Sequence, residues 1–198
     1  MPQHPAPFRL VCVAACVLAL AGCDTLGGLD FGGGSAASAA ATGIDYRADD
    51  LAAAVFAIDL PAGVRPRNGG TTATLDLSAP KGEKHVAATL VLADGSAADA
   101  TLPPPASGRS YVFFGFADRD KSALRAAQAW LRALPPDAQP VTAFSVAPGL
   151  CATGRLDTAS ATYSVIPVLP GKPLLPLVSD APIAGLIPSA GAPLPACA

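Results

Sequence analysis

Proline is the feature that most limits what this 198-residue chain can fold into. The sequence has 21 prolines, and all but Pro2, Pro5 and Pro7 lie after residue 22. Because proline removes a backbone donor and clashes with the preceding helical turn, prolines at this density exclude a helical bundle. The apolar runs between them are short and end at Gly or Pro, which is typical of strands joined by turns.

Several of these runs have the pattern of β-strands. Residues 56–60, 72–77 and 86–92 alternate apolar and polar side chains, as half-buried strands do, and turn residues follow each one. Residues 111–116 are apolar on both faces, which indicates a central strand. Further strands are expected at 144–146 and 163–168. Strands at this spacing are typical of a sandwich or a barrel, and we expect a mainly β fold with a small β-sandwich-like domain.

One amphipathic helix is predicted over residues 119–134. Apolar residues fall on one face at spacings of three and four, at Leu124, Ala127, Leu131 and Leu134. Pro135 and Pro136 end the helix. Asp118 or Asp120 is expected to cap its N-terminus, and Arg132 lies near the negative end of its dipole. We expect it to cover an open face or end of the sheet; binding a partner is the alternative.

The C-terminal segment, residues 167–198, is rich in both proline and large apolar residues. Because proline cannot donate to a central ladder, edge strands or extended coil lying on the sandwich are expected here. The alternative is an exposed apolar docking strip, for which Leu174, Leu175 and Leu177 are the candidates.

The N-terminal segment has the pattern of a secretion signal. Arg9 is the only Lys or Arg in the first 46 residues, and an unbroken apolar run follows over residues 10–21. This run is too short for a bilayer span of ~20 residues. It closes on Leu20-Ala21-Gly22-Cys23, which resembles the lipobox of the bacterial lipoproteins. In that class the Cys thiol receives a diacylglyceryl group, the signal peptidase cuts just before it, and the new amino terminus is commonly acylated.

The resemblance implies that Cys23 is the lipidated first residue of the mature chain. An ordinary signal peptide or an uncleaved anchor is the alternative. Two or more acyl chains hold a protein stably on a bilayer. We therefore expect a lipid-anchored protein of the bacterial cell envelope that faces the periplasm, with a further envelope protein as partner. Asp24 favours the inner membrane by the rule of enteric bacteria, and the outer membrane is the other location.

Three regions follow from this pattern. Residues 1–22 are the signal peptide, residues 23–44 are the lipidated Cys and a flexible Gly/Ala/Ser tether, and residues 45–198 are a single β-rich periplasmic domain. The chain carries 13 Lys and Arg against 15 Asp and Glu without a basic cluster, so nucleic acid is not an expected partner. No second apolar run is long enough to span a membrane.

The five cysteines divide by location. Cys12 and Cys16 leave with the signal peptide, and Cys23 takes the lipid. Cys151 and Cys197 remain as a pair in an oxidising compartment, which predicts one disulfide. A redox pair or two metal ligands is the alternative, but the sequence has no Cys-x-x-Cys motif to favour it.

Residues suited to catalysis or metal binding are few. His85 is the only histidine after residue 22, no Gly-x-Ser-x-Gly motif accompanies it, and a solvated histidine at a strand end is expected. A zinc site needs more His or Cys than the chain has. Glu83 is the only glutamate. The cluster Asp45, Asp49 and Asp50 lacks the alternating spacing of a calcium loop.

The sequence therefore predicts a membrane-anchored envelope lipoprotein with a structural or protein-binding role, no enzymatic activity and no cofactor or metal. The alternative is a periplasmic module that binds a glycan or a small ligand. Such a module predicts that Tyr111, Trp130 or Tyr163 faces solvent in one cleft, and burial of all three would exclude it.

Overall fold

The computed structural model describes residues 36–38, 43–187 and 192–197. These residues form a mainly β fold, which confirms the predicted class. The strands are β1 Ala36–Ser38, β2 Val55–Pro61, β3 Val64–Pro66, β4 Thr72–Ala79, β5 Gly82–Leu92, β6 Arg109–Phe116, β7 Val141–Ala147, β8 Leu150–Ala152, β9 Thr162–Val168 and β10 Val178–Pro182. The helices are the short α2 Ser96–Asp99, the long α3 Asp118–Arg132 and the 3-10 turns η1 Leu51–Ala53 and η2 Ile183–Leu186.

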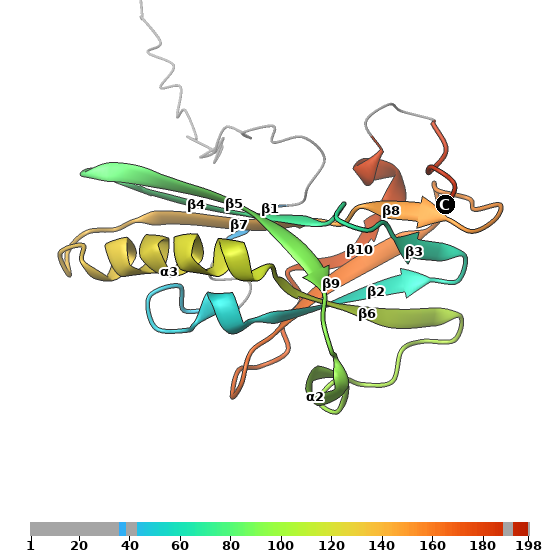
Figure 1. The fold of residues 1–198 in the computed structure, drawn as a ribbon, viewed down its shortest axis with the longest axis horizontal. Helices are drawn as coiled ribbons and strands as arrows, with labels where there is room; N and C mark the ends of the chain where they lie inside the picture. The colour runs from blue at the N-terminus through green and yellow to red at the C-terminus, as the bar shows by residue number, and fades with distance from the viewer. Residues whose placement is uncertain (1–35, 39–42, 188–191, 198) are drawn as a thin grey trace, which may run out of the picture. The chain divides into compact units, whose positions relative to one another are not determined.

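Eight strands form one curled antiparallel sheet in the order β1-β7-β4-β5-β6-β2-β9-β10. The long strand β5 belongs to both halves of this sheet, because residues 82–89 pair with β4 and residues 90–92 pair with β6. The sheet bends at this change of partner, so that β4 and β7 form one layer and β2 and β6 the other (Figure 1). The result is the expected sandwich-like arrangement, with β6 in the central position predicted for it.

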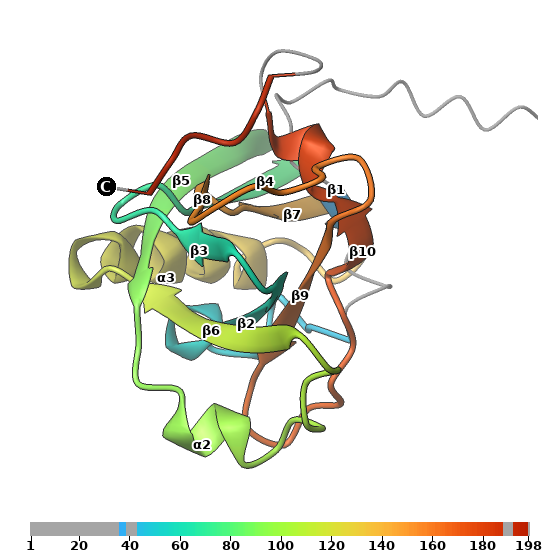
Figure 2. The same ribbon diagram turned by 90° about the vertical axis from the view of Figure 1, so that its right-hand side faces the viewer.

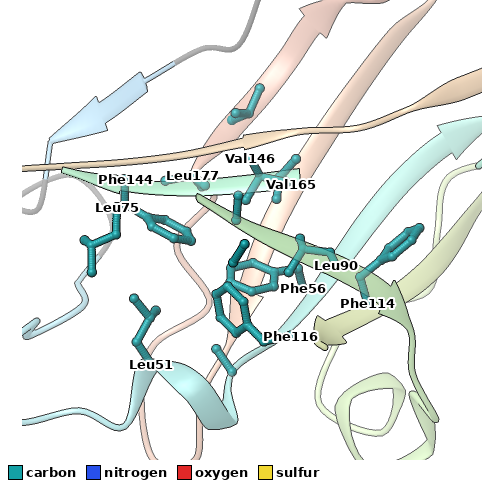
Figure 3. Packing of buried hydrophobic residues seen from close by; sticks show 14 of the residues in the cluster. Leu51, Phe56, Leu75, Leu90, Phe114, Phe116, Phe144, Val146, Val165 and Leu177 are labelled. Atoms are coloured by element: carbon teal, nitrogen blue, oxygen red, sulfur yellow. The ribbon is translucent and has the colours of Figure 1, made fainter. Parts of the chain in front are cut away.

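The core lies between the two layers and follows the predicted alternation. Phe56, Ile58 and Leu60 on β2 are all fully buried. Phe56 stacks on Phe144 of the opposite layer with ring centroids 5.7 Å apart and meets Phe116 edge-on at 5.4 Å. Such aromatic pairs contribute about 0.5–1.5 kcal/mol each beyond the area they bury. Figure 3 shows these three rings at the centre of the cluster, so the aromatic contacts join the layers.

Helix α3 closes one end of the sandwich, as its amphipathic pattern predicts. Leu124, Ala127 and Leu131 are buried against the core, and Trp130 packs on it half-buried. The apolar face is therefore used inside the domain. Within the described ranges no helix is long and apolar enough to cross a bilayer.

The predicted cap of α3 is wrong. Ala117 occupies the N-cap position, and no side chain caps the helix. Asp118 accepts a hydrogen bond from Lys121 Nζ at 2.7 Å, and Asp120 Oδ2 accepts one from the Thr89 N–H at 2.7 Å. The reason lies in β5. Ala117 follows β6 opposite Thr89, but its carbonyl accepts the Asp120 N–H inside the helix and is not available to the Thr89 N–H. The Asp120 carboxylate accepts the Thr89 N–H in place of that carbonyl.

Strand β1 falls within residues 23–44, the range for which the sequence predicts a tether. Ala36, Ala37 and Ser38 pair with β7 at the edge of the sheet. A β-ladder uses backbone groups, so three small residues are enough to extend an edge. The rest of the predicted tether up to residue 35, together with residues 39–42, lies outside the described residues.

A second, two-stranded sheet of β3 and β8 joins the C-terminal segment to the domain. Ala152 on β8 accepts a hydrogen bond from the Cys197 N–H and donates one to Pro195 O, both at 2.9 Å. Strand β10 is an edge strand of the large sheet, as the prolines predict. Its edge is blunted by a bulge and by Asp180, which has a positive φ of 45°.

Candidate binding groove

The described residues include the predicted disulfide cysteines but not the predicted lipidation site. Cys23 lies outside the described residues, so its lipidation stays a prediction. Cys151 and Cys197 form a disulfide with an S–S distance of 2.11 Å. This bond ties the C-terminal segment to β8, beside the two backbone hydrogen bonds of Ala152.

A groove opens where β4 and β5 separate. The last hydrogen bond between them runs from the Leu90 N–H to Thr71 O at 2.9 Å. The connection from β3 to β4 is bonded elsewhere: the Arg67 N–H donates to Gly149 O at 2.7 Å, and the Gly149 N–H donates to Thr71 Oγ1 at 3.3 Å. Residues 67–70 therefore do not extend the β4–β5 ladder. Strand β5 continues past the start of β4 and pairs there with β6 on its other side (Figure 2).

Core residues form the floor of this groove. It has a volume of about 200 Å³ and is lined by Arg67, Asn68, Leu90, Leu92 and Phe114, among others. Leu90 and Phe114 are 1% and 2% exposed, and Figure 3 shows Phe114 at one end of the core cluster. Leu92 lies on the same face of β5 as Leu90 but is 59% exposed. A core-facing position is thus left in solvent because no chain covers it.

The backbone beside the groove is unpaired at Leu92. Backbone groups alternate sides along a strand: the Leu90 N–H bonds toward β4, at Thr71 O, and the Ala93 N–H bonds toward β6, at Phe113 O. Leu92 therefore directs its N–H and C=O toward the β4 side. Within the described ranges these two groups make no hydrogen bond to a protein atom. The groove is flanked by a short free sheet edge.

One cation borders the groove. Arg67 is exposed and forms no ion pair with any residue that the structure describes. Its side chain folds over Gly70, where an added Cβ would lie 3.3 Å from Arg67 Nε. No acidic residue lines the groove. Asp94, two residues beyond Leu92, accepts the Ser96 N–H at 2.9 Å, and this hydrogen bond lowers the pKa of its carboxyl below the usual 3.8.

The acidic cluster of Asp45, Asp49 and Asp50 is bonded to neighbouring parts of the domain. Asp50 pairs with Arg125 at 3.1 Å, and Asp49 pairs with Lys172 at 2.9 Å. Gln128 of α3 is 1% exposed and donates to Asp49 O at 2.7 Å. Asp45 accepts backbone N–H groups of its own turn. These contacts fix residues 45–50 against α3.

His85 is exposed on β5 opposite Asp76 on β4. Its Nδ1 lies 2.6 Å from Asp76 Oδ1, with the histidine side chain 61% exposed. The pair is a cross-strand contact in solvent. Among the described residues, no three His, Cys, Asp or Glu side chains gather closely enough to hold a metal.

The three aromatic residues named for a ligand cleft do not share one. Tyr163 is 1% exposed and faces the core, whereas Trp130 packs on the core from α3. Tyr111 is half-buried on the outer face of β6 beside Phe113, and burial raises its pKa above the usual 10.0. The segment before α2 covers this face, because a Cβ on Gly95 would lie 1.9 Å from the Phe113 ring. These three side chains therefore do not form the solvent-facing cleft that the ligand-binding alternative predicts.

Sequence reasoning missed an ion pair on the outer face of the same layer. Arg109 Nε lies 2.8 Å from Asp59 Oδ2, and both side chains are 17% exposed. Arg109 also donates to the backbone carbonyls of Asp59 and Thr162, each at 3.2 Å. It therefore links β6, β2 and β9, which is a structural role.

The apolar tail packs on its own domain. Leu177 is 5% exposed, and its N–H donates to Val165 O at 2.8 Å. Leu174 is half-buried, and Leu175 is 38% exposed. The described residues of this segment, up to Ile187 and from 192 to 197, therefore do not form a continuous apolar docking strip.

Comparison of the chain with protein-family models, with curated proteins and with solved structures finds no match. The assignment of the groove as a candidate binding site therefore rests on its geometry alone. The sequence conceals it because Leu92 continues the alternation of Leu90 like any core residue. The turn-forming run Asn68-Gly69-Gly70 before β4 is the one signal that β4 begins too late to cover Leu92.

Proposed function

We propose that the protein is a lipid-anchored protein of the cell envelope whose β domain binds another protein at the groove between Arg67 and Leu92. The resemblance of residues 9–23 to a lipobox supports the anchor. The binding role rests on one observation, the 59% exposure of Leu92 at a position that faces the core.

Burial of the exposed Leu92 side chain by a partner would contribute favourable binding free energy. Burying a leucine side chain fully is worth about 1.5–3 kcal/mol, and more than half of the Leu92 side chain stays in water. Val91 beside it is 44% exposed. Apolar side chains that gather at a hollow mark interaction sites more often than isolated ones do.

The anchor would keep such a partner close to the membrane. Two or more acyl chains on Cys23 are enough for stable attachment. Strand β1 begins at Ala36, so the tether that remains between Cys23 and the sheet is about a dozen residues long. A Gly-rich coil of that length has a root-mean-square span of ~20 Å. The expected partner is therefore itself on or near the bilayer.

The anchor is tested by the intact mass of the full chain extracted from membranes. We expect a chain that begins at Cys23 and carries diacylglyceryl and acyl groups. A Cys23→Ala variant should lose this mass and leave the membrane fraction. An unlipidated mass for the unchanged chain would remove the anchor from the proposal.

The binding role is tested by a photo-reactive amino acid placed at residue 92 in cells. Position 141 is the control, because Val141 is 70% exposed and does not line the groove. We expect a discrete cross-linked protein from position 92 that is absent from position 141 and weakened by Arg67→Ala. The same products from both positions, or none from position 92, would contradict a binding groove.

A further inference from the structure

We propose that the groove binds the extended C-terminal end of a partner protein. In this complex the ligand pairs with Leu92, its last side chain fills the hollow above Leu90 and Phe114, and its terminal carboxylate binds Arg67. This inference rests on the proposed function and names the chemistry of the same site.

The unpaired backbone of Leu92 favours a peptide. Its N–H and C=O face the side that β4 has left, and the described residues provide no partner for either. An extended chain beside β5 supplies one acceptor and one donor at this position, as in other cases of strand addition. A ligand without a peptide backbone would leave these two groups to water.

The position of β4 implies that the ligand ends here. Beyond Leu92 toward the start of β5, the same side of the strand is already occupied, because Thr71 accepts the Leu90 N–H and Thr72 pairs with Thr89. A ligand strand lies in line with β4 and therefore stops at Thr71. Only a chain terminus fits that point without a sharp bend.

Charge selects which terminus it is. Arg67 stands at the beginning of the connection to β4, lines the groove and has no ion pair among the described residues. The N–H groups of Asn68 and Gly69, next in the chain, likewise make no hydrogen bond to a described residue. A guanidinium with free backbone N–H groups suits a carboxylate and repels an amine. The ligand would thus run antiparallel to β5.

The size of the hollow fits one side chain. Its volume of about 200 Å³ lies below the ~300–1,000 Å³ of sites that enclose drug-sized ligands. The floor of Leu90 and Phe114 is apolar and almost fully buried. We therefore expect the last residue of the ligand to be apolar, such as Leu, Val or Phe.

The test measures fluorescence anisotropy of labelled hexapeptides with the full chain in detergent micelles. The probe is fluorescein-Gly-Ser-Thr-Val-Thr-Leu with a free carboxylate, and its matched control is the same peptide with a C-terminal amide. We expect the amide to bind at least about 10-fold more weakly, because it loses charge-assisted hydrogen bonds. Replacing the last Leu by Asp should weaken binding by a similar factor.

Protein variants assign the effect to the groove. Arg67→Gln should weaken the acid peptide about 10-fold and leave the amide peptide unchanged. Arg65→Gln is the control, since Arg65 is exposed on β3 and does not line the groove. Leu92→Asp should abolish binding, whereas Val141→Asp should not. Circular dichroism and Trp130 fluorescence establish that each variant is folded.

Three results would overturn the inference: equal binding of acid and amide peptides, no peptide binding up to about 1 mM, or displacement of the peptide by octanoate at equal affinity. The last result would assign the groove to a small amphiphile. If cross-linking from position 92 succeeds while the peptides fail, the proposed function stands and only the C-terminal ligand is rejected.

Discussion

The contact between Asp120 and Thr89 makes a sharp prediction about how the sheet changes layers. Asp120 Oδ2 accepts the Thr89 N–H at 2.7 Å at the point where β5 leaves β4 for β6. The backbone carbonyl that would otherwise accept this N–H belongs to Ala117 and is used inside α3. Asp120→Ala therefore removes the acceptor that the described residues provide for this N–H and should destabilise the fold.

The size of the effect follows from burial and charge. A hydrogen bond to a charged group is worth about 1.5–3 kcal/mol, and a buried donor left without a partner costs about 1–3 kcal/mol. The Asp120 side chain is 21% exposed, so water reaches the site in part. We expect Asp120→Ala to cost about 2 kcal/mol, or about 4–8 °C in melting temperature for a domain of this size. Asp120→Asn keeps an acceptor and should cost about half as much.

Asp118→Ala is the matched control. Asp118 lies in the same first turn of α3 and interacts similarly with the helix dipole, but its side chain is 95% exposed and, among the described residues, pairs with Lys121 alone. Urea unfolding followed by Trp130, the only tryptophan of the chain, gives the free energy of unfolding. Hydrogen exchange of the Thr89 amide reports the contact directly. Equal stabilities of Asp120→Ala and Asp118→Ala, with unchanged Thr89 exchange, would contradict this prediction.

Three further predictions test other parts of the structure. Gly149→Ala should cost about 1–3 kcal/mol in thermal unfolding, because its Cβ would lie 2.4 Å from the Gly70 backbone, whereas Gly154→Ala meets no atom within 4 Å and should be neutral. Replacing the cysteines of the 46-residue loop closed by Cys151 and Cys197 should cost about 2–4 kcal/mol, and thiol labelling of these two cysteines in the unchanged chain should require reduction. Hydrogen bonds from Lys121 to Asp118 and from Ser160 to Asp157 lower the pKa of both carboxyls below 3.8. The stability that the two carboxylates contribute is therefore complete above that pH and is lost as the pH falls through their lower pKa in the folded state. The double variant Asp118→Asn, Asp157→Asn should show a shallower loss of stability between about pH 4 and pH 2, measured by urea unfolding.

Local patterns predicted the parts of the fold that local physics decides. Alternation placed Phe56, Ile58 and Leu60 in the core because a strand with one buried face must repeat every two residues. The spacing of Leu124, Ala127 and Leu131 predicted the inward face of α3 for the corresponding helical reason. Prolines predicted that the C-terminal strand lies at an edge. Each of these inferences needs only neighbours within a few residues.

Features that depend on distant partners could not be predicted in this way. The sequence predicts Asp118 or Asp120 as the helix cap because Asp is common there, but Asp120 bonds instead to Thr89, which lies 31 residues away. Gln128 faces the core although it is polar, because the backbone of residues 46 and 49 supplies two acceptors for it. Ala36–Ser38 has a linker composition and still pairs with β7, since pairing uses no side chain. The sequence carries no local mark of any of these contacts.

The groove depends both on a local pattern and on contacts between residues distant in the chain. Its residues therefore have the sequence pattern of core residues although they line a surface site. Leu92 is apolar and in phase with Leu90, so by sequence it belongs inside. It is exposed because the connection before β4 is bonded to Gly149 and not to β5 beyond Leu90. The Gly149 N–H donates to Thr71 Oγ1, and these two residues lie 78 positions apart in the chain. A sheet that curls by exchanging partners must leave part of the shared strand uncovered on each side of the exchange. In this protein α3 covers one such place through Asp120, and the other is the groove.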